Sequence, residues 1–163
     1  MSREHSFKLT ISNNATEKEG INYLIKQHTG FFKIDKEMKK VLLDKVSQPY
    51  RFLQSFDVVY IPRLKGIEFK EQHIETHLDE LLFIELKTTK KFLPENPKGF
   101  FFGATENEFD FGQALGDKFR FCFVCLNPES LSYKLLTLEE LDKIIKNKRI
   151  QFQINLWIWI STS

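Results

Sequence analysis

The chain contains few of the residues that cross-link, stiffen or loosen a protein. Its 163 residues include two cysteines, five prolines and seven glycines, and 28 % of them are charged. The scarcity of proline and glycine beside this charge content argues against a disordered chain. No apolar run approaches the ~20 residues of a membrane span, and residues 1–5 hold no apolar signal segment. We therefore expect a soluble, cytoplasmic protein with no membrane partner.

Several chemical signatures are also missing or incomplete. There is no Gly-rich phosphate loop and no Gly-x-Ser-x-Gly elbow, which argues against a nucleotide-driven motor and a serine hydrolase. Cys122 and Cys125 lie three residues apart in an apolar strand pattern, and side chains at that spacing face opposite sides. This geometry suits neither one disulfide nor one metal ion, so we expect two buried thiols.

The chain is instead rich in core-forming residues, since 42 % are hydrophobic and 17 are phenylalanine. This length suits a single domain over residues 1–163, in which residues 63–80 form an insertion. The net charge of +2 and the pI near 8.4 weakly favour a polyanionic partner.

Hydrophobic periodicity and capping signals predict an α/β fold. We expect helices over residues 16–28, 35–46, 71–79, 105–115 and 137–147. We expect a short hairpin over residues 67–70 and strands over residues 56–62, 81–88, 99–103, 118–126 and 151–160. This order predicts a mixed central β-sheet flanked by helices.

Two of the predicted strands carry charged residues that a buried strand does not normally contain. Asp57 lies in one apolar run, and Glu85 and Lys87 lie in another. Ionised side chains are rarely buried unless they are paired or bind a metal, because desolvating a lone charge is unfavourable. Glu85 and Lys87 share one face of their strand, because alternate side chains point the same way. The pattern indicates either a divalent-metal site with an electrophilic helper or a structural salt bridge at a strand end.

The oxygen donors of such a site are hard ligands. Asp57, Glu85 and the backbone carbonyl of Leu86 would hold Mg²⁺, with Mn²⁺ as the alternative ion. The metal would polarise a scissile phosphate and lower the pKa of a bound water. Lys87 would orient that water or stabilise the charge that develops on phosphorus. This is the chemistry of phosphodiester cleavage.

The Glu-x-Lys spacing alone does not identify the site, because it occurs three times. Glu37 and Lys39 fall in a helical pattern, where residues two apart do not face each other. Glu68 and Lys70 fall in a polar, turn-flanked segment and are expected to be solvated, although a hairpin there would make Glu68 a rival. Only Glu85 lies in a strongly apolar strand.

Five short blocks in the sequence surround these residues in a fixed order. They are Glu-Lys-Glu-Gly-Ile-Asn-Tyr-Leu, Phe-Asp-Val-Val, Phe-Ile-Glu-Leu-Lys-Thr-Thr, Thr-Glu-Asn-Glu-Phe and Leu-Gly-Asp-Lys-Phe, at residues 17–24, 56–59, 83–89, 105–109 and 115–119. The order of helical acid, strand Asp, strand Glu-x-Lys, helix and strand resembles the PD-(D/E)xK nuclease superfamily, which has the restriction-endonuclease-like fold. A closer resemblance is to its NO VEIN C-terminal domain branch.

The resemblance implies a Mg²⁺-dependent endonuclease that acts on nucleic acid, DNA above all, in restriction, defence or repair. It implies Glu17 as a further catalytic acid beside Asp57, Glu85 and Lys87. Glu17 shares a helix face with apolar residues four and seven positions on, which would aim it at the sheet. Its alternative role is to stabilise the helix N-terminus.

A two-strand cut by so short a chain needs two active sites, so we expect a homodimer on double-stranded DNA. Thr88, Lys90 and Lys91 would contact backbone phosphates, or else form only a strand end and a solvated loop. Asn107 opens a helix whose N–H groups suit a phosphate, although a capping box also explains the pattern, and Gln113 projects from the same helix. The alternative function is a non-catalytic nucleic-acid-binding or interaction module with a nuclease-like fold.

Overall fold

The structure is a computed structural model that describes residues 15–26, 30–64 and 66–157. A helix over residues 15–26 comes first, and the expected end of this helix lies outside the described residues. The elements that follow are β1 (Phe31–Lys33), α2 (Lys36–Lys45), the 3₁₀ helix η1 (Tyr50–Phe52), β2 (Val58–Tyr60), α3 (Glu71–His77), β3 (Leu82–Thr89), α4 (Glu106–Leu115), the 3₁₀ helix η2 (Gly116–Lys118), β4 (Phe119–Cys125), β5 (Ser132–Leu136) and α5 (Leu138–Ile144).

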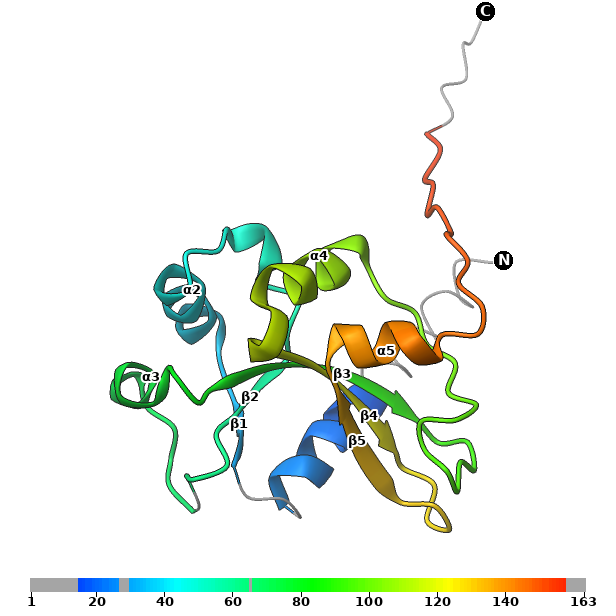
Figure 1. Cartoon of the computed structure of the whole chain (residues 1–163), viewed down its shortest axis with the longest axis horizontal. Helices are drawn as coiled ribbons and strands as arrows, with labels where there is room; N and C mark the ends of the chain where they lie inside the picture. Colours follow the sequence, from blue (N-terminus) through cyan, green and yellow to red (C-terminus); the bar gives the residue numbers. More distant parts are fainter. Residues whose placement is uncertain (1–14, 27–29, 65, 158–163) are drawn as a thin grey trace, which may run out of the picture.

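The strands of the described chain form one mixed sheet in the order β1-β2-β3-β4-β5. β1, β2 and β3 are antiparallel neighbours, β4 runs parallel to β3, and β5 runs antiparallel to β4. A parallel step needs a crossover connection, and α4 lies in it. Figure 1 shows α4 and α5 over one face of the sheet and the N-terminal helix, in blue, over the other. The predicted α/β class, with a mixed sheet flanked by helices, is confirmed.

Alternation along β3 and β4 separates two apolar layers. Phe83, Phe119 and Phe121 belong to the layer beneath α4, where the ring centroids of Phe83 and Phe111 lie 5.6 Å apart. The opposite layer packs against the N-terminal helix and contains the alternate residues Ile84, Leu86, Cys122 and Val124. Because both faces of β3 are covered, the middle of this strand is buried, and so is any charged residue that it carries.

The capping boxes form as the sequence predicts. Thr105 Oγ1 accepts from the N–H of Glu108 at 3.2 Å, and Glu108 Oε2 accepts from the N–H of Thr105 at 3.2 Å. Thr137 and Glu140 form the same pair at the start of α5. Each box satisfies two N–H groups that a helix start otherwise leaves without an intrahelical partner.

The predicted strand over residues 99–103 is wrong. Phe100 and Phe102 do alternate with Phe101, which is 93 % exposed. Their rings pack on that of Phe123, with centroids 5.0 Å away in each case. The segment therefore lies against the aromatic face of the sheet and does not pair with an edge strand.

The predictions for residues 67–70 and 151–157 are also wrong, because neither segment is a strand. In the first, Phe69 anchors the chain alone by stacking on Phe32, with ring centroids 5.3 Å apart. In the second, the large apolar side chains are 73 % to 85 % exposed, and the segment leaves the body of the molecule (Figure 1). Residues 158–160 of that predicted strand lie outside the described residues.

Two short edge strands, β1 and β5, are absent from the sequence-based prediction. Three and five residues give too little alternation to detect. Cys122 and Cys125 are buried free thiols, as expected. None of the helices within the described part of the chain is both long and apolar enough to cross a bilayer.

Candidate active site

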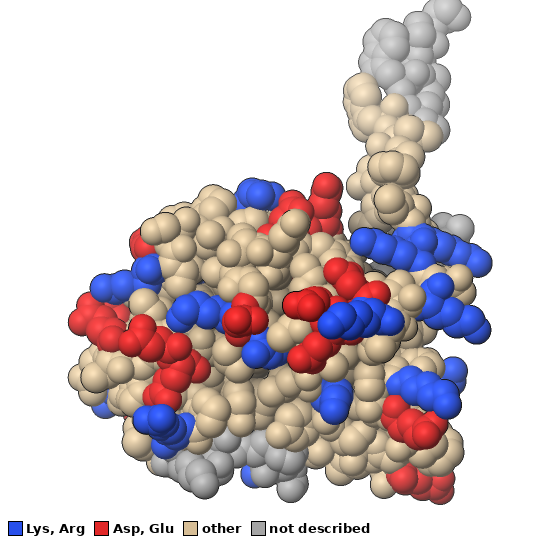
Figure 2. Space-filling model, in the orientation of Figure 1, with Lys and Arg blue, Asp and Glu red and all other residues tan. Residues whose placement is uncertain are grey.

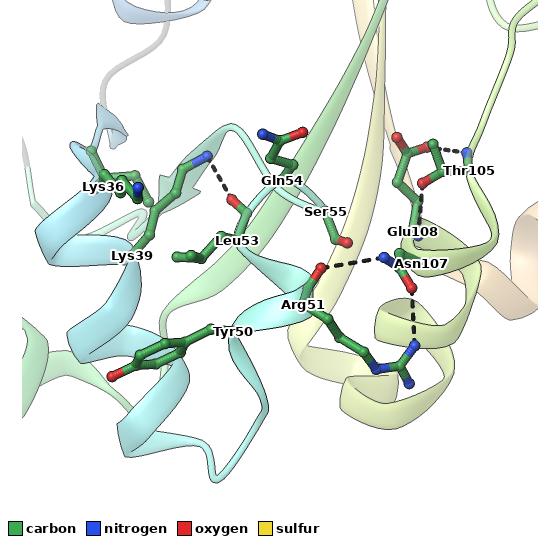
Figure 3. Close-up of a pocket in the computed structure, with 11 residues that line it drawn as sticks. Lys36, Lys39, Tyr50, Arg51, Leu53, Gln54, Ser55, Thr105, Asn107 and Glu108 are labelled. Atoms are coloured by element: carbon green, nitrogen blue, oxygen red, sulfur yellow. Dashed lines mark hydrogen bonds between the residues drawn. The ribbon is translucent and has the colours of Figure 1, made fainter. Parts of the chain in front are cut away.

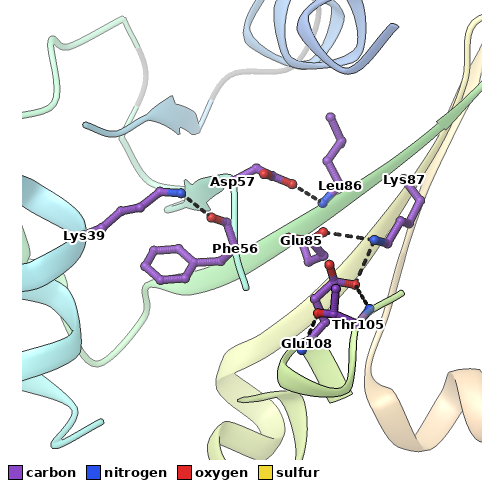
Figure 4. Close-up of polar contacts among 8 residues, drawn as sticks. All are labelled: Lys39, Phe56, Asp57, Glu85, Leu86, Lys87, Thr105 and Glu108. Carbon is purple, nitrogen blue, oxygen red and sulfur yellow. Dashed lines mark hydrogen bonds and ion pairs between the residues drawn. The ribbon is translucent and has the colours of Figure 1, made fainter. Parts of the chain in front are cut away.

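The pairing of β2 with β3 brings the predicted acids together. Val58 pairs with Ile84, so the residue before β2 and the residue after Ile84 fall opposite each other. The N–H of Asp57 donates to the carbonyl of Ile84 at 2.8 Å, and the N–H of Leu86 donates to Asp57 Oδ2 at 2.7 Å. Figure 4 shows Asp57 reaching β3 beside Glu85. This contact fixes the Asp57 carboxyl group at the point where β2 gives way to open space.

Lys87 occupies the same face of β3 as Glu85, as predicted. Its Nζ donates to Glu85 Oε1 at 3.0 Å and to Glu108 Oε2 of α4 at 2.8 Å (Figure 4). All three side chains are at least 88 % buried, because the exposed fractions are 12 %, 7 % and 8 %. Glu108 therefore has two roles, since it caps α4 and also holds the Lys87 ammonium.

The second oxygen of Glu85 has no such partner. Among the described residues, no hydrogen-bond donor reaches Glu85 Oε2, which is fully buried. Burial raises the pKa of Glu85 well above its usual value, and the charge of Asp57 raises it further, against the opposing effect of Lys87. A buried carboxylate oxygen without a donor is unfavourable, so this position favours a proton or a cation.

The same electrostatics extend to the other two acids. Burial raises the pKa of Asp57, although the N–H of Leu86 and the charge of Lys39 act against this effect. Burial also raises the pKa of Glu17, and the neighbouring Asp57 is the second cause. Glu17 comes from the N-terminal helix, so an acid from each side of the sheet edge meets the acids of β2 and β3. The three carboxyl groups together hold more negative charge than their surroundings compensate.

Gly20 explains how the N-terminal helix brings Glu17 so close to the sheet. A Cβ atom at Gly20 would collide with Cγ2 of Thr88 and lie 3.1 Å from Cδ2 of Leu86. The helix can therefore lie this near to β3 only with glycine at that position. Glu17 is one turn before Gly20, which places its side chain beside the end of β2.

Lys39 belongs to the site, although the sequence pattern only assigned it to a helix. Its Nζ donates to the carbonyl of Phe56 at 2.6 Å and to that of Leu53 at 3.1 Å. It thereby ties α2 to the chain that enters β2. No local signal in the sequence could reveal this, because the contact spans 17 residues.

These side chains line an open cleft of about 880 Å³. Of the residues predicted to contact nucleic acid, Thr88 and Lys90 line this cleft. Asn107 lines a neighbouring pocket, where it pairs with Arg51. Lys91 and Gln113 are exposed and line neither hollow, so the structure does not bring them to the site.

The donors at the centre of the cleft fit a cation with few protein ligands. Within residues 15–26, 30–64 and 66–157, no group of three or more His, Cys, Asp and Glu side chains is arranged to hold a metal ion. Asp57 and Glu85 are a smaller set, and the carbonyl of Leu86 points to the same side of the strand as its N–H, toward Asp57. Mg²⁺ is commonly held by one or two carboxylates and keeps several waters. The unpartnered Glu85 Oε2 is the atom that such an ion would satisfy.

Basic and acidic side chains are interspersed over the face of the molecule in Figure 2. That face therefore offers no broad single-sign surface for a polyanion. No protein-family model matches this chain, and no curated protein or solved structure matches it either. The family resemblance thus stays a prediction, and any function has to be argued from the cleft itself.

Proposed function

We propose that this chain is a metal-dependent endonuclease that hydrolyses phosphodiester bonds of nucleic acid, with double-stranded DNA as the substrate and Mg²⁺ or Mn²⁺ as the ion. The observation that carries the proposal is the carboxyl pair of Asp57 and Glu85, which has a buried oxygen without a donor beside the Lys87 ammonium in an open cleft. Hard oxygen donors next to a fixed cation are what phosphoryl transfer needs.

The order of the elements supports a restriction-endonuclease-like core. An acid lies on the first helix, Asp57 precedes β2, Glu85 and Lys87 lie on β3, and α4 leads to the parallel strand β4. This is the order that the sequence resemblance implies. Four separate elements contribute to one cleft, which is more than a chance Glu-x-Lys motif would produce.

Each side chain has a role that follows from its surroundings. Asp57, Glu85 and the Leu86 carbonyl would hold the ion, which when bound supplies polarisation of the phosphate and acidification of a water. Burial lowers the pKa of Lys87, but Glu85 and Glu108 together raise it by more, so Lys87 stays protonated. A protonated amine cannot act as a base. Its third N–H, not used by Glu85 or Glu108, is available to stabilise charge on a phosphate.

Glu17 is the remaining acid with a role to fill. Its raised pKa lets it hold a proton close to neutral conditions, and its contact with Asp57 keeps it at the mouth of the cleft. In this position it can accept a proton from an attacking water and release it to solvent.

The direct test is cleavage of plasmid, linear duplex, single-stranded DNA and RNA with Mg²⁺ or Mn²⁺, with and without EDTA. The matched variant is Asp57→Asn, which keeps an oxygen that can accept from the Leu86 N–H but removes the charge. Products that form only with metal and are lost in this variant support the proposal. Cleavage by Asp57→Asn at the wild-type rate contradicts it.

A second function has its own observation in favour. The Lys87 ammonium is already paired with two carboxylates, which is also what a purely structural ion cluster would look like. In that case the chain would be a non-catalytic nucleic-acid-binding or interaction module. Binding that persists in EDTA, with no cleavage of any substrate under any metal, would establish this alternative.

A further inference from the structure

A second hollow adjoins the acidic cleft (Figure 3). It has a volume of about 710 Å³ and lies between α2, the chain around η1 and the start of α4. Three of its lining residues, Lys39, Gln54 and Glu108, also line the cleft. The two hollows therefore share a wall, and a chain-like ligand in one can continue into the other.

The two hollows differ in charge. The cleft is lined by the acids Glu17, Asp57, Glu85 and Glu108. The second hollow is lined by the cations Lys36, Lys39 and Arg51, and the single acid on its wall is Glu108. That carboxylate is already paired with Lys87. An anion is therefore favoured in the second hollow, directly beside the place where a divalent cation is favoured.

The cations of this hollow are held in place before any ligand arrives. The guanidinium carbon of Arg51 lies 4.2 Å from the centroid of the Phe52 ring, and its NH1 donates to Asn107 Oδ1 at 2.9 Å. A planar guanidinium fixed in this way still has other N–H groups to present to a phosphate. Lys39 uses two of its three N–H donors on backbone carbonyls, which leaves one. Asp110 at 3.4 Å from Arg51 compensates part of the charge, but both of these side chains are about half exposed.

We propose that this hollow, through Lys36, Lys39 and Arg51, binds the sugar-phosphate backbone next to the scissile phosphate. The inference deepens the proposed function, because it specifies a strand that continues past the cut and so assigns an internal position on a polynucleotide as the substrate. A free nucleotide or an end group alone would fill only one hollow.

Binding without cleavage tests this inference separately. A labelled single-stranded oligonucleotide and its duplex are titrated in EDTA at several salt concentrations, with wild type, Lys36→Gln, Arg51→Gln and the charge-keeping Arg51→Lys. The control is Lys143→Gln, which removes another cation from an exposed ion pair, at 3.2 Å from Glu139. Thermal unfolding of each variant confirms the fold.

Lys36→Gln and Arg51→Gln should each weaken binding several-fold and lower the slope of log Kd against log salt by about one, and Lys143→Gln should change neither. Arg51→Lys should keep most of the salt slope but lose affinity, because it loses the planar donor arrangement. Unchanged affinity and slope in both Gln variants would overturn the inference, as would a wild type that binds no oligonucleotide. Inorganic phosphate binding as tightly as the oligonucleotide would also overturn it, since it would indicate a site for free phosphate.

The two proposals fail in different ways. A wild type that cleaves with Mg²⁺ while Arg51→Gln binds normally removes only the backbone subsite. A protein that binds through Lys36 and Arg51 but cleaves nothing with any metal removes only the nuclease.

Discussion

Glu85-Leu86-Lys87 and Glu68-Phe69-Lys70 have the same spacing of acid and base, yet their surroundings are opposite. Glu68 and Lys70 are exposed, in a segment without helix or strand that leads into α3. Glu85 is only 5 % exposed, in the middle of a strand whose two faces are both covered. The comparison shows that the motif does not make the site. The site arises where a helix covers the face on which the charges lie.

The middle residue of each motif shows how this difference arises. Phe69 is buried while its two neighbours point to solvent, so the motif straddles the surface. Leu86 is buried on the face opposite to that of Glu85, against the N-terminal helix. The charges of Glu85 and Lys87 have α4 above them, and Glu108 completes their pairing. Removing water from both faces is what makes these charges depend on one another.

The largest expected difference between the two motifs is in activity. Glu85→Gln should lower metal-dependent cleavage by about 100-fold to 1000-fold, because it removes a ligand charge at the reacting centre. Glu68→Gln should leave the rate unchanged, because Glu68 is exposed and outside the cleft. Single-turnover cleavage at saturating metal measures both variants. Equal rates for the two would mean that the buried motif has no catalytic role.

The next comparison is between the two lysines. Lys87→Met should lower the free energy of unfolding by about 3 kcal/mol at neutral pH, since it leaves Glu85 and Glu108 buried without their shared cation. Lys70→Met should change it by less than about 0.5 kcal/mol, as is usual for exposed positions. Urea unfolding followed by circular dichroism gives both values. A small loss in Lys87→Met would show that solvent reaches the Glu85–Glu108 pair.

The local chemistry of the sequence accounts for much of this arrangement. The alternation in residues 82–89 and 119–125, the Thr-x-x-Glu caps and the unusual acids in apolar runs were all local patterns, and they identified β3, β4, α4 and the Asp57, Glu85 and Lys87 set. Such patterns are readable because side-chain direction repeats with period two in a strand. The expected acid–base set meets in one cleft because pairing between β2 and β3 is register-specific.

The parts that were not predicted depend on contacts distant in sequence. β1 is three residues long and exists because the N–H of Ile61 bonds to the carbonyl of Gly30, among other pairs with β2. Lys39 joins the site only through backbone carbonyls 14 and 17 residues away. Glu108 had a sufficient local explanation as a helix cap, which concealed its contact with Lys87. Residues 151–157 show the reverse case, since strand-like alternation there has no sheet to join within the described residues.

Coverage of the second face of β3 can be disturbed at Gly20. Gly20→Ala should lower the free energy of unfolding by about 2 kcal/mol, because its Cβ would collide with Thr88 Cγ2 and force the N-terminal helix outward. Thr88→Ser removes that methyl group, so the double variant should recover most of the loss. Chemical unfolding of the four proteins in this cycle measures the coupling. Failure of Thr88→Ser to rescue would mean that the contact with Leu86 Cδ2 dominates.

The raised pKa values give a pH dependence that separates the two motifs. A carboxyl group whose pKa is higher in the folded than in the unfolded state stabilises the fold below its unfolded pKa, and this contribution is lost as pH rises through the folded pKa. Without metal, Glu85 should therefore stabilise the protein near pH 4.5 and below, and this effect should disappear at higher pH. The pKa of Lys87 is raised from 10.5, so this group does not titrate in that range.

The measurement for this effect is the difference in unfolding free energy between wild type and Glu85→Gln from pH 4.5 to pH 8. The difference should move in favour of the variant as pH rises, because Gln has no charge to bury. The same difference taken with Glu68→Gln should be flat by comparison. A wild type that gains on Glu85→Gln with rising pH would show that Lys87 compensates Glu85 fully, in conflict with the unpartnered Oε2.

The smallest expected effect joins metal binding to the same atom. A divalent ion that binds only the folded protein should raise its stability by about 1.4 kcal/mol when present at ten times its Kd. Mg²⁺ or Mn²⁺ should do this for wild type and Glu68→Gln at pH 8, where Asp57 and Glu85 are more ionised, and not for Glu85→Gln. The gain should also shrink at pH 5, since protons and the ion compete for the same carboxylates. Stabilisation that is equal in Glu85→Gln would place the ion elsewhere on the chain, whereas its loss only in that variant would assign the ion to the buried motif.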